Sequence, residues 1–216
     1  WTVVGERTMC TGGASPLLEP AQLGLKHQIV SAFFFSSRRR DRSFLPVRGL
    51  GDAVLKGRPL AGDEAFGVIL ADDLCINEEG VNVMAQMVKI YEKYRCTIIA
   101  VMEVPKEQVS SYGVIAGNFV EEDLIMVNSM IEKPSPQEAP SNLAIIGRYI
   151  LTPDIFGILE NTKAGKNGEI QLTDALLTQA TNGMVLAYKF KGKRFDCGSV
   201  EGFVEATNYF YEKSKC

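Results

Sequence analysis

Two neighbouring carboxylates, Asp72 and Asp73, stand directly behind an apolar run that begins at Phe66. A short apolar run without alternation predicts a strand that is buried on both faces. In open α/β sheets, ligands bind beyond the carboxyl ends of such strands. Two adjacent acids at this position can hold a hard cation such as Mg2+. For the pair taken alone, the better explanation is that one acid caps the next segment and the other is solvated, so the pair alone does not establish a site.

Three further polar clusters are expected at the ends of predicted strands: Tyr112-Gly113, Glu132-Lys133 and Asp196. Glu132 offers an acceptor for hydroxyl groups, and Lys133 offers a cation for a phosphate. Asp196 offers a second carboxylate for the metal at Asp72. A surface ion pair or an ordinary turn explains any one cluster. Together, on converging strands, the clusters predict a site for phosphate and metal.

Regular elements are predicted from residue 47 onward. Apolar runs predict strands at 66–72, 96–102, 142–151 and 184–190. Apolar residues at helical spacing, together with turn and capping signals, predict helices at 81–94, 153–161, 169–180 and 200–213. Residues 112–115 and 124–131 flank a polar turn and are expected to pair as antiparallel strands. Strand, helix and strand between residues 66 and 102 form a βαβ unit, which indicates an α/β fold.

Composition limits the function classes. With 216 residues, 46% of them apolar and 23% charged, the chain is expected to form one globular domain. The net charge of -3 argues against a nucleic-acid partner. No apolar run reaches the roughly 18 to 20 residues of a membrane span, and we expect no secretory signal. Five scattered cysteines and a single histidine argue against a zinc site and favour reduced thiols in the cytoplasm.

Residues 1–46 differ from the remainder and show no clear period. Phe33-Phe-Phe-Ser-Ser-Arg-Arg-Arg40 is compatible with a basic patch for an anionic partner or with a poorly structured stretch. We favour a third interpretation, in which this run is translated adapter DNA joined to the reading frame. The segment 1–46 is therefore expected to be artefactual or disordered, and 47–216 to be the folded domain.

From Gly49 to about Lys213 the chain resembles the bacterial UTP–glucose-1-phosphate uridylyltransferases, also called UDP-glucose pyrophosphorylases. The matching segments occur in family order and lie at 49–54, 68–74, 112–115, 132–134, 141–153, 169–175 and 191–199. The longest is Ser-Asn-Leu-Ala-Ile-Ile-Gly-Arg-Tyr-Ile-Leu-Thr-Pro at 141–153. The resemblance implies a partial nucleotidyltransferase domain at 47–216. Its fold would be α/β, a mixed, mostly parallel sheet between helices, lacking the family's first strand and phosphate loop.

The resemblance implies nucleotidyl transfer. An oxygen of glucose 1-phosphate attacks the α-phosphorus of UTP, so that pyrophosphate leaves and UDP-glucose forms. Such chemistry depends on positioning and on neutralising charge, to which Mg2+ and lysines are suited. The resemblance also implies a homo-oligomer for the intact family, while the composition leads us to expect a cytoplasmic protein without nucleic-acid or membrane partners.

The family's functional residues carry over by position. Asp72 matches the catalytic, metal-binding aspartate, Asp196 a second metal ligand, and Lys133 the catalytic lysine at the sugar phosphate. Gly113 and Glu132 match residues that hold glucose hydroxyls. The other substrate-binding positions implied are Gly49 and Gly51 near uracil and ribose, Asp73 beside the metal aspartate, and Ile145 at the border of the sugar pocket.

The sequence also departs from the family. Asp52 stands where the family has His. Residues 1–46 contain no match to the family's opening strand, its Gly-rich loop with Arg and Lys, or its uracil-binding glutamine. Because the missing strand is central to the family's sheet, we expect unpaired backbone groups and exposed apolar surface in the sheet, and little or no activity. A related enzyme that uses dTTP or another sugar phosphate, and a non-catalytic module that binds nucleotide sugars or aids assembly, are the alternatives.

Overall fold

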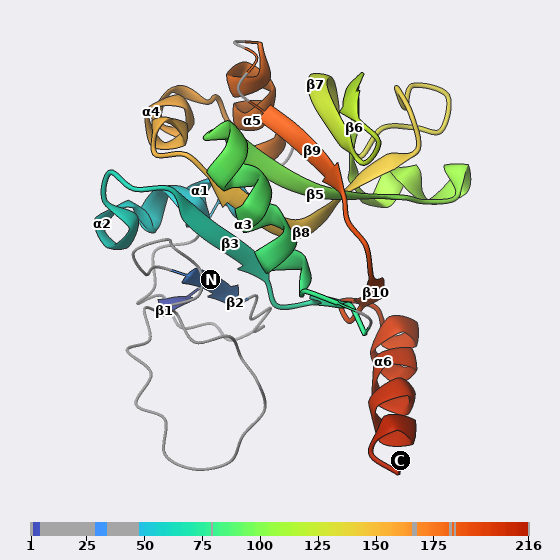
Figure 1. Ribbon diagram of the computed structural model, residues 1–216. Coiled ribbons are helices and arrows are strands. Elements are labelled where there is room, and N and C mark those ends of the chain that lie inside the picture. The colour runs from blue at the N-terminus through green and yellow to red at the C-terminus, as the bar shows by residue number, and fades with distance from the viewer. Residues whose placement is uncertain are drawn as a thin grey trace.

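The computed structural model describes residues 2–4, 29–33, 48–78, 80–165, 168–181, 183 and 185–215 (Figure 1). Its helices are α1 (Gly49–Lys56), α2 (Arg58–Ala61), α3 (Val83–Tyr94), the 3-10 helix η2 (Lys106–Ser111), α4 (Asp154–Asn161), α5 (Leu172–Ala180) and α6 (Val200–Lys213). Its strands are β1 (Thr2–Val4), β2 (Ile29–Phe33), β3 (Phe66–Leu70), β4 (Asp73–Ile76), β5 (Thr97–Glu103), β6 (Gly113–Glu121), β7 (Leu124–Glu132), β8 (Leu143–Leu151), β9 (Val185–Lys189) and β10 (Lys193–Asp196). The predictions for the remaining residues of 1–46 lie outside the described residues.

The strands form one large mixed sheet and one small sheet. The large sheet has the order β1-β2-β3-β8-β5-β9-β7-β6, and β4 pairs with β10 in the small one. The predicted α/β fold with a mixed sheet between helices is confirmed. The expectation of mostly parallel pairing is wrong, because among the described strands of the large sheet only β2–β3 and β5–β9 are parallel neighbours. Strand β8 enters antiparallel between β3 and β5, with Phe66 opposite Leu151 and Ile98 opposite Ile150.

Strand β3 has a parallel neighbour on its other side. The backbone of β2 lies beside it in register, with Val30 opposite Val68. The expectation of unpaired backbone groups along β3 is therefore wrong, because β2 supplies the missing hydrogen-bonding partners.

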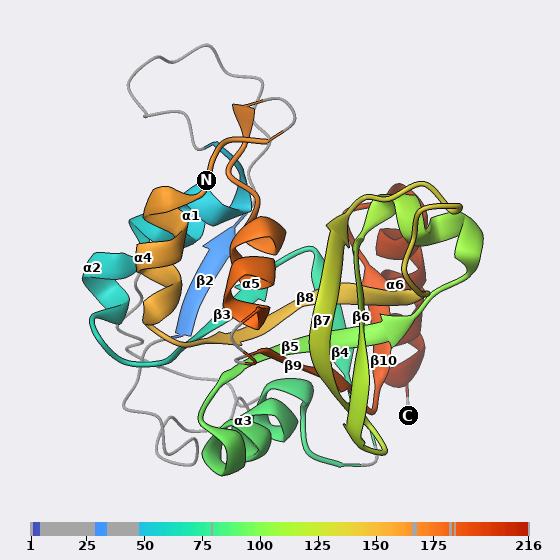
Figure 2. The same cartoon turned by 90° about the horizontal axis from the view of Figure 1, so that it is seen from above.

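Helices cover both faces of the large sheet, with α1, α4 and α5 on one side and α3 on the other (Figure 2). Successive side chains of β5 point to opposite faces of the sheet, which explains why the strand contributes to two separate hydrophobic cores. Ile99 and Val101 belong to the core beneath α1, α4 and α5. Ile98 and Ala100 belong to the core beneath α3. A strand buried on both faces reads as a continuous apolar run, which is why the sequence pattern of β5 was unambiguous.

The predicted helix ends agree with the structure only in part. Asn82 accepts a hydrogen bond from the Ala85 N–H at 2.9 Å, so α3 begins at Val83, two residues after the predicted start at 81, and ends at Tyr94 as expected. Thr152 followed by Pro153 predicts a helix capped by Thr152 with Pro153 at its first position. This prediction is wrong, because Pro153 is the cap residue of α4 and the Thr152 hydroxyl lies 3.0 Å from that of Thr97 inside the core. The helix predicted from residue 169 begins later, at Leu172.

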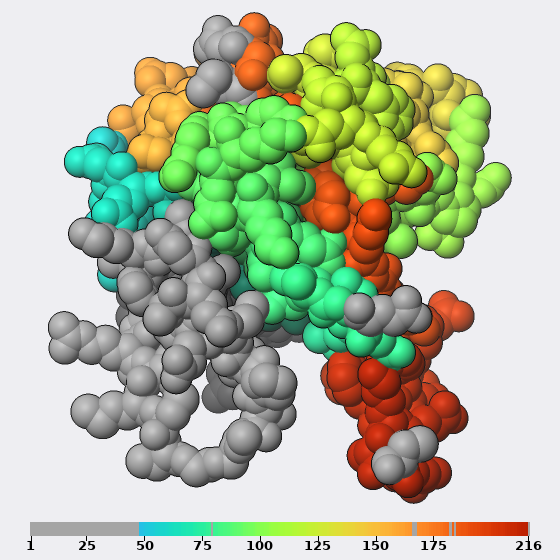
Figure 3. Space-filling model, in the orientation of Figure 1, coloured from blue at the N-terminus to red at the C-terminus, as the bar shows by residue number. Residues whose placement is uncertain are grey.

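Helix α6 projects from the rest of the described residues (Figure 3). It begins at Val200 and ends at Lys213, as predicted, and Tyr209 packs on Phe195 of β10 with ring centroids 5.1 Å apart. No described helix combines the length and the apolar character needed to cross a membrane.

The delayed start of α5 results from a close approach of two backbones. The Ile170 N–H donates to the Arg48 carbonyl at 2.7 Å, and the Gly51 N–H donates to the Ile170 carbonyl at 2.9 Å. A Cβ at Gly51 would lie 2.7 Å from the Ile170 oxygen. Gly51, for which the resemblance implies a position near uracil and ribose, is thus in contact with the chain's own backbone.

Two helical glycines provide a matched test. Gly51→Ala is expected to lower the free energy of unfolding by about 1–3 kcal/mol, because the added methyl group meets the Ile170 backbone. Gly157→Ala in α4 is expected to raise it by about 0.5–1 kcal/mol, because nothing lies within 4 Å of its Cβ position. Urea unfolding followed by circular dichroism measures both. Equal effects of the two substitutions would contradict the packing described for Gly51.

Candidate functional site

One cavity of about 430 Å³ gathers nearly all the residues singled out from the sequence. Those lining it are Gly49, Asp72, Asp73, Gly113, Glu132, Lys133, Ile145 and Asp196. Gly51 does not line it, because it lies against Ile170. The predicted convergence of the polar clusters on one cleft is therefore found, while the individual roles stay predictions.

Strand pairing explains the convergence. Asp72 follows the end of β3, and in the small sheet Asp73 of β4 lies opposite Asp196 of β10. Gly113 lies opposite Glu132 because β6 and β7 are antiparallel. Tyr112-Gly113 lies at the beginning of its strand, since Gly113 begins β6. The beginning of one antiparallel strand and the end of its neighbour lie at the same edge, so the cluster still reaches the cleft.

Two carboxylates border one small space. The position that a Cβ would take at Gly198 lies 3.1 Å from Asp196 Oδ1 and 3.3 Å from Asp72 Oδ2. Asp72 Oδ1 is buried without a hydrogen-bond partner among the described residues. Across those same residues, no cluster of three or more His, Cys, Asp or Glu side chains is placed to hold a metal. Two carboxylates with an unsatisfied buried oxygen nevertheless suit a hard cation that completes its shell with water and phosphate oxygens.

The charge state of Asp72 reflects this environment. Burial raises its pKa, and the nearby carboxylates of Asp73 and Asp196 raise it further, while its own backbone hydrogen bond lowers it. The net result is a pKa above the ordinary value. A cation between Asp72 and Asp196 would remove the repulsion that contributes to this shift.

Asp73 has a different environment from its neighbour. Its Oδ2 accepts the Gly147 N–H at 2.8 Å, and its Oδ1 accepts a hydrogen bond from Arg194 Nε. Arg148 donates to the Asp73 carbonyl and, at 3.0 Å, to the Leu70 carbonyl. Both carboxylate oxygens of Asp73 are thus already engaged within the protein, so the predicted substrate contact would need an oxygen that is shared.

The opposite wall carries the groups suited to a sugar phosphate. Thr173 Oγ1 donates to Glu132 Oε2 at 2.6 Å, which fixes the carboxylate. A Cβ at Gly113 would lie 3.1 Å from the same oxygen and 3.0 Å from Ile145 Cδ1, so only glycine leaves this space open. Lys133 has a φ of 48°, and its backbone N–H donates to the Tyr112 carbonyl at 2.9 Å. Among the described residues, none forms a hydrogen bond or ion pair with the Lys133 ammonium.

Sequence reasoning missed the residues that hold the predicted ones in place. Arg194, Thr173 and Arg148 were not singled out, yet they contact Asp73, Asp196 or Glu132. One signal was available for Arg194: two residues before Asp196 on a strand, it shares a face with that aspartate. Thr173 and Arg148 meet their partners only through the fold, across 41 and 75 positions of the chain.

Asp52 has a structural position, although the family has His there. Its Oδ2 accepts hydrogen bonds from the Arg48 N–H and from Lys56 Nζ, both at 2.8 Å, and so satisfies the first turn of α1. Burial raises the pKa of Asp52, but these hydrogen bonds outweigh it and leave the pKa below the ordinary value. Asp52 does not line the cavity.

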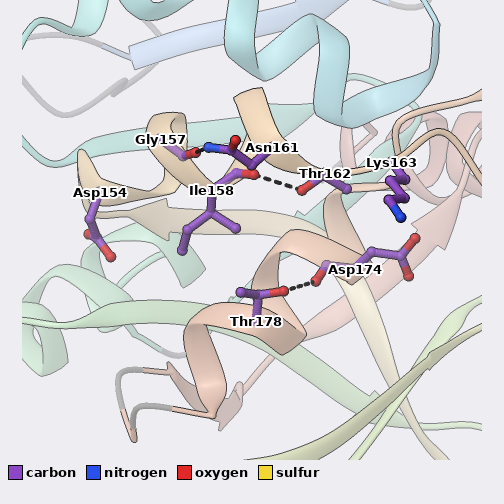
Figure 4. A pocket seen from close by; sticks show the side chains of 8 residues that line it. All are labelled: Asp154, Gly157, Ile158, Asn161, Thr162, Lys163, Asp174 and Thr178. Carbon is purple, nitrogen blue, oxygen red and sulfur yellow. Dashed lines mark hydrogen bonds between the residues drawn. The ribbon is translucent and has the colours of Figure 1, made fainter.

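A second hollow lies between α4 and α5 (Figure 4). Asn161, Thr162 and Thr178 donate from their side chains to carbonyls of their own helices, at 2.8, 2.9 and 3.1 Å. None of the residues predicted to act in chemistry lines it. Its polar groups are largely used inside the helices, so it is the weaker candidate.

Comparison with known proteins identifies the family of the chain. The nucleotidyl transferase family model matches residues 25–213. The UTP–glucose-1-phosphate uridylyltransferase of Pseudomonas aeruginosa strain PAO1 is 59% identical over 190 residues, which are 88% of this chain and 66% of that protein. A second Pseudomonas aeruginosa protein of that name is 65% identical over 166 residues, 77% of this chain and 60% of the relative. The chain thus spans less than two thirds of the length of these curated relatives.

The solved structures that match this chain include enzymes of the same kind. A UDP-glucose pyrophosphorylase complexed with UDP-glucose matches with a TM-score of 0.77 and 57% identity, over 78% of this chain and 64% of that one. The UTP-bound enzyme from Acinetobacter baumannii matches with a TM-score of 0.66 and 37% identity, over 75% and 56% of the two chains. Because the family model covers most of its length, the chain belongs to the nucleotidyl transferase family.

Proposed function

We propose that the cavity serves the transfer of a uridylyl group from UTP to glucose 1-phosphate, which forms UDP-glucose and pyrophosphate. One observation carries the proposal: a single cavity combines a carboxylate pair, an uncommitted lysine and a carboxylate fixed for hydroxyl binding. The names and ligands of the similar proteins support it. UTP, glucose 1-phosphate and UDP-glucose are therefore the proposed small-molecule partners.

The charge of each residue determines its proposed role. The Lys133 ammonium would neutralise the sugar phosphate and orient its attacking oxygen, while Glu132, held by Thr173, would accept hydrogen bonds from glucose hydroxyls. Asp72 and Asp196 would hold Mg2+, to which the orphaned Asp72 Oδ1 and the space at Gly198 are suited. When bound, Mg2+ supplies charge neutralisation at the phosphates. The cytoplasmic location and the homo-oligomeric state expected from the sequence stay predictions.

Calorimetry and a coupled assay for pyrophosphate release test the proposal. The chain is expected to bind UDP-glucose more tightly than dTDP-glucose. Turnover of UTP and glucose 1-phosphate is expected to be low, because residues 1–46 contain no match to the family's phosphate loop. Preference for dTDP-glucose would favour the dTTP-dependent alternative, and UDP-glucose binding without any turnover would favour the non-catalytic module. If neither nucleotide sugar binds, the proposal fails.

Thr173 provides a test of the sugar-binding wall. Thr173→Val removes the hydroxyl that donates to Glu132 at nearly constant volume. A hydrogen bond to a charged group contributes about 1.5–3 kcal/mol, so UDP-glucose binding is expected to weaken by roughly 10-fold to 100-fold. Thr173→Ser keeps the hydroxyl and serves as the matched control. If calorimetry gives equal affinities for the two variants, Thr173 does not act through Glu132.

Asp72 is expected to destabilise the metal-free fold. Its pKa is raised on folding, so its charged form costs stability at every pH above that raised pKa. In EDTA at pH 7.5, Asp72→Asn is expected to raise the free energy of unfolding by about 1 kcal/mol, since it removes a charge with an unpaired buried oxygen.

The gain should shrink as the pH falls through the folded pKa of Asp72 and vanish below the ordinary value of 3.8, where the wild-type carboxyl is protonated as well. Urea unfolding at pH 7.5 and at low pH measures both limits. Asp73→Asn is the matched control and should destabilise the fold instead, because the Asp73 carboxylate is paired with Arg194.

A further inference from the structure

Arg194 lies between the two carboxylates of the small sheet and a tyrosine. Its Nε donates to Asp73 Oδ1, its Nη1 donates to the Tyr112 hydroxyl at 3.0 Å, and its Nη2 lies 3.3 Å from Asp196 Oδ2. The side chain is only 9% exposed. All three nitrogens of one planar group therefore have different partners, drawn from β4, β10 and the end of η2.

The contacts on Asp196 decide where its two carboxylate oxygens point. Its Oδ2 faces Arg194 and also accepts a long hydrogen bond from the Tyr112 hydroxyl, at 3.4 Å. Its Oδ1 accepts the Gly198 N–H at 3.1 Å and borders the space shared with Asp72. The Asp196 side chain is 41% exposed, so burial alone does not hold it. Arg194 and Tyr112 are the side chains that fix its orientation.

Arg194 also decides which acids face the cation. Asp72, Asp73 and Asp196 lie close enough to influence one another electrostatically. Arg194 pairs with Asp73, whose other oxygen is taken by the Gly147 N–H. Asp73 is thereby neutralised and turned inward. The pair that remains is Asp72 and Asp196.

We propose that Arg194 is a positioning residue for the divalent-cation site, which it builds by aiming Asp196 at the space beside Gly198 and by withdrawing Asp73 from it. The inference rests on the proposed function, because nucleotidyl transfer is what calls for the cation. It assigns Tyr112 a supporting role through the same Asp196 oxygen. A lysine could not replace Arg194, because one ammonium cannot bridge three partners set in a plane.

Mn2+ binding to the full chain, measured by electron paramagnetic resonance, tests the proposal without requiring turnover. Arg194→Lys keeps the charge beside Asp73 but gives up the contacts with Tyr112 and Asp196. Outer-shell partners of metal ligands typically contribute 10-fold to 100-fold to affinity, so Mn2+ binding is expected to weaken about 10-fold or more. Arg58→Lys is the matched control, because Arg58 forms an exposed pair with Glu160, and it should leave Mn2+ affinity unchanged.

Tyr112→Phe keeps the test decisive if Arg194→Lys fails to fold, as circular dichroism would report. It removes one hydroxyl and is expected to weaken Mn2+ binding about 3-fold or more, in the same direction and less than Arg194→Lys. Wild-type Mn2+ affinity in a folded Arg194→Lys, or in Tyr112→Phe when the first variant does not fold, would overturn the proposal, provided that Asp196→Asn weakens binding.

The unmutated chain separates this inference from the proposed function. If it binds UDP-glucose by calorimetry but no Mn2+, the cation site and the role of Arg194 are both overturned while the nucleotide-sugar site stands. If it binds Mn2+ with the expected order of variants but no UDP-glucose, the role of Arg194 is supported and the proposed function fails.

Discussion

The antiparallel insertion of β8 between β3 and β5 is the constraint on which the rest of the structure depends. Its alternating side chains enter the cores on both faces of the sheet, with Tyr149 and Leu151 on one side and Ile146 and Ile150 on the other. The same strand reaches the cleft, where the Gly147 N–H holds Asp73 and Arg148 holds the turn after β3. Core packing and site geometry therefore share one element, and a shift of β8 along its axis would disturb both.

Much of the fold followed from sequence because its signals are local. The helices that begin at Val83 and Val200 have polar caps directly before them, and β5 is an apolar run long enough to be read without tertiary information. The direction of strand pairing could not be read, because the order β3-β8-β5 depends on a strand about seventy residues beyond β3. The late start of α5 was missed for a similar reason, since Ile170 pairs with the backbone near α1.

The residues of the site also differ in whether local sequence could identify them. The residues that are proposed to touch ligand could be singled out because their chemistry is visible in a short stretch of sequence, such as a carboxylate after a buried strand or a lysine before a proline. Residues that position them were missed, because Thr173 and Arg148 are ordinary in their own segments and acquire a role only where distant elements meet. The local sequence indicates which residues have suitable chemistry, but only the folded structure shows which residues position them.

The backbone at Lys133 has a consequence for which sequences this site can tolerate. Its left-handed conformation, with φ of 48°, costs a side-chain-bearing residue of order 1–2 kcal/mol relative to glycine. Selection for thermal stability alone would favour Gly or Asn at this position. Selection for phosphate binding would favour a cation there. Under the role proposed for Lys133, these two pressures oppose each other at one residue, so the identity of residue 133 in related sequences would indicate whether they retain the proposed phosphate contact.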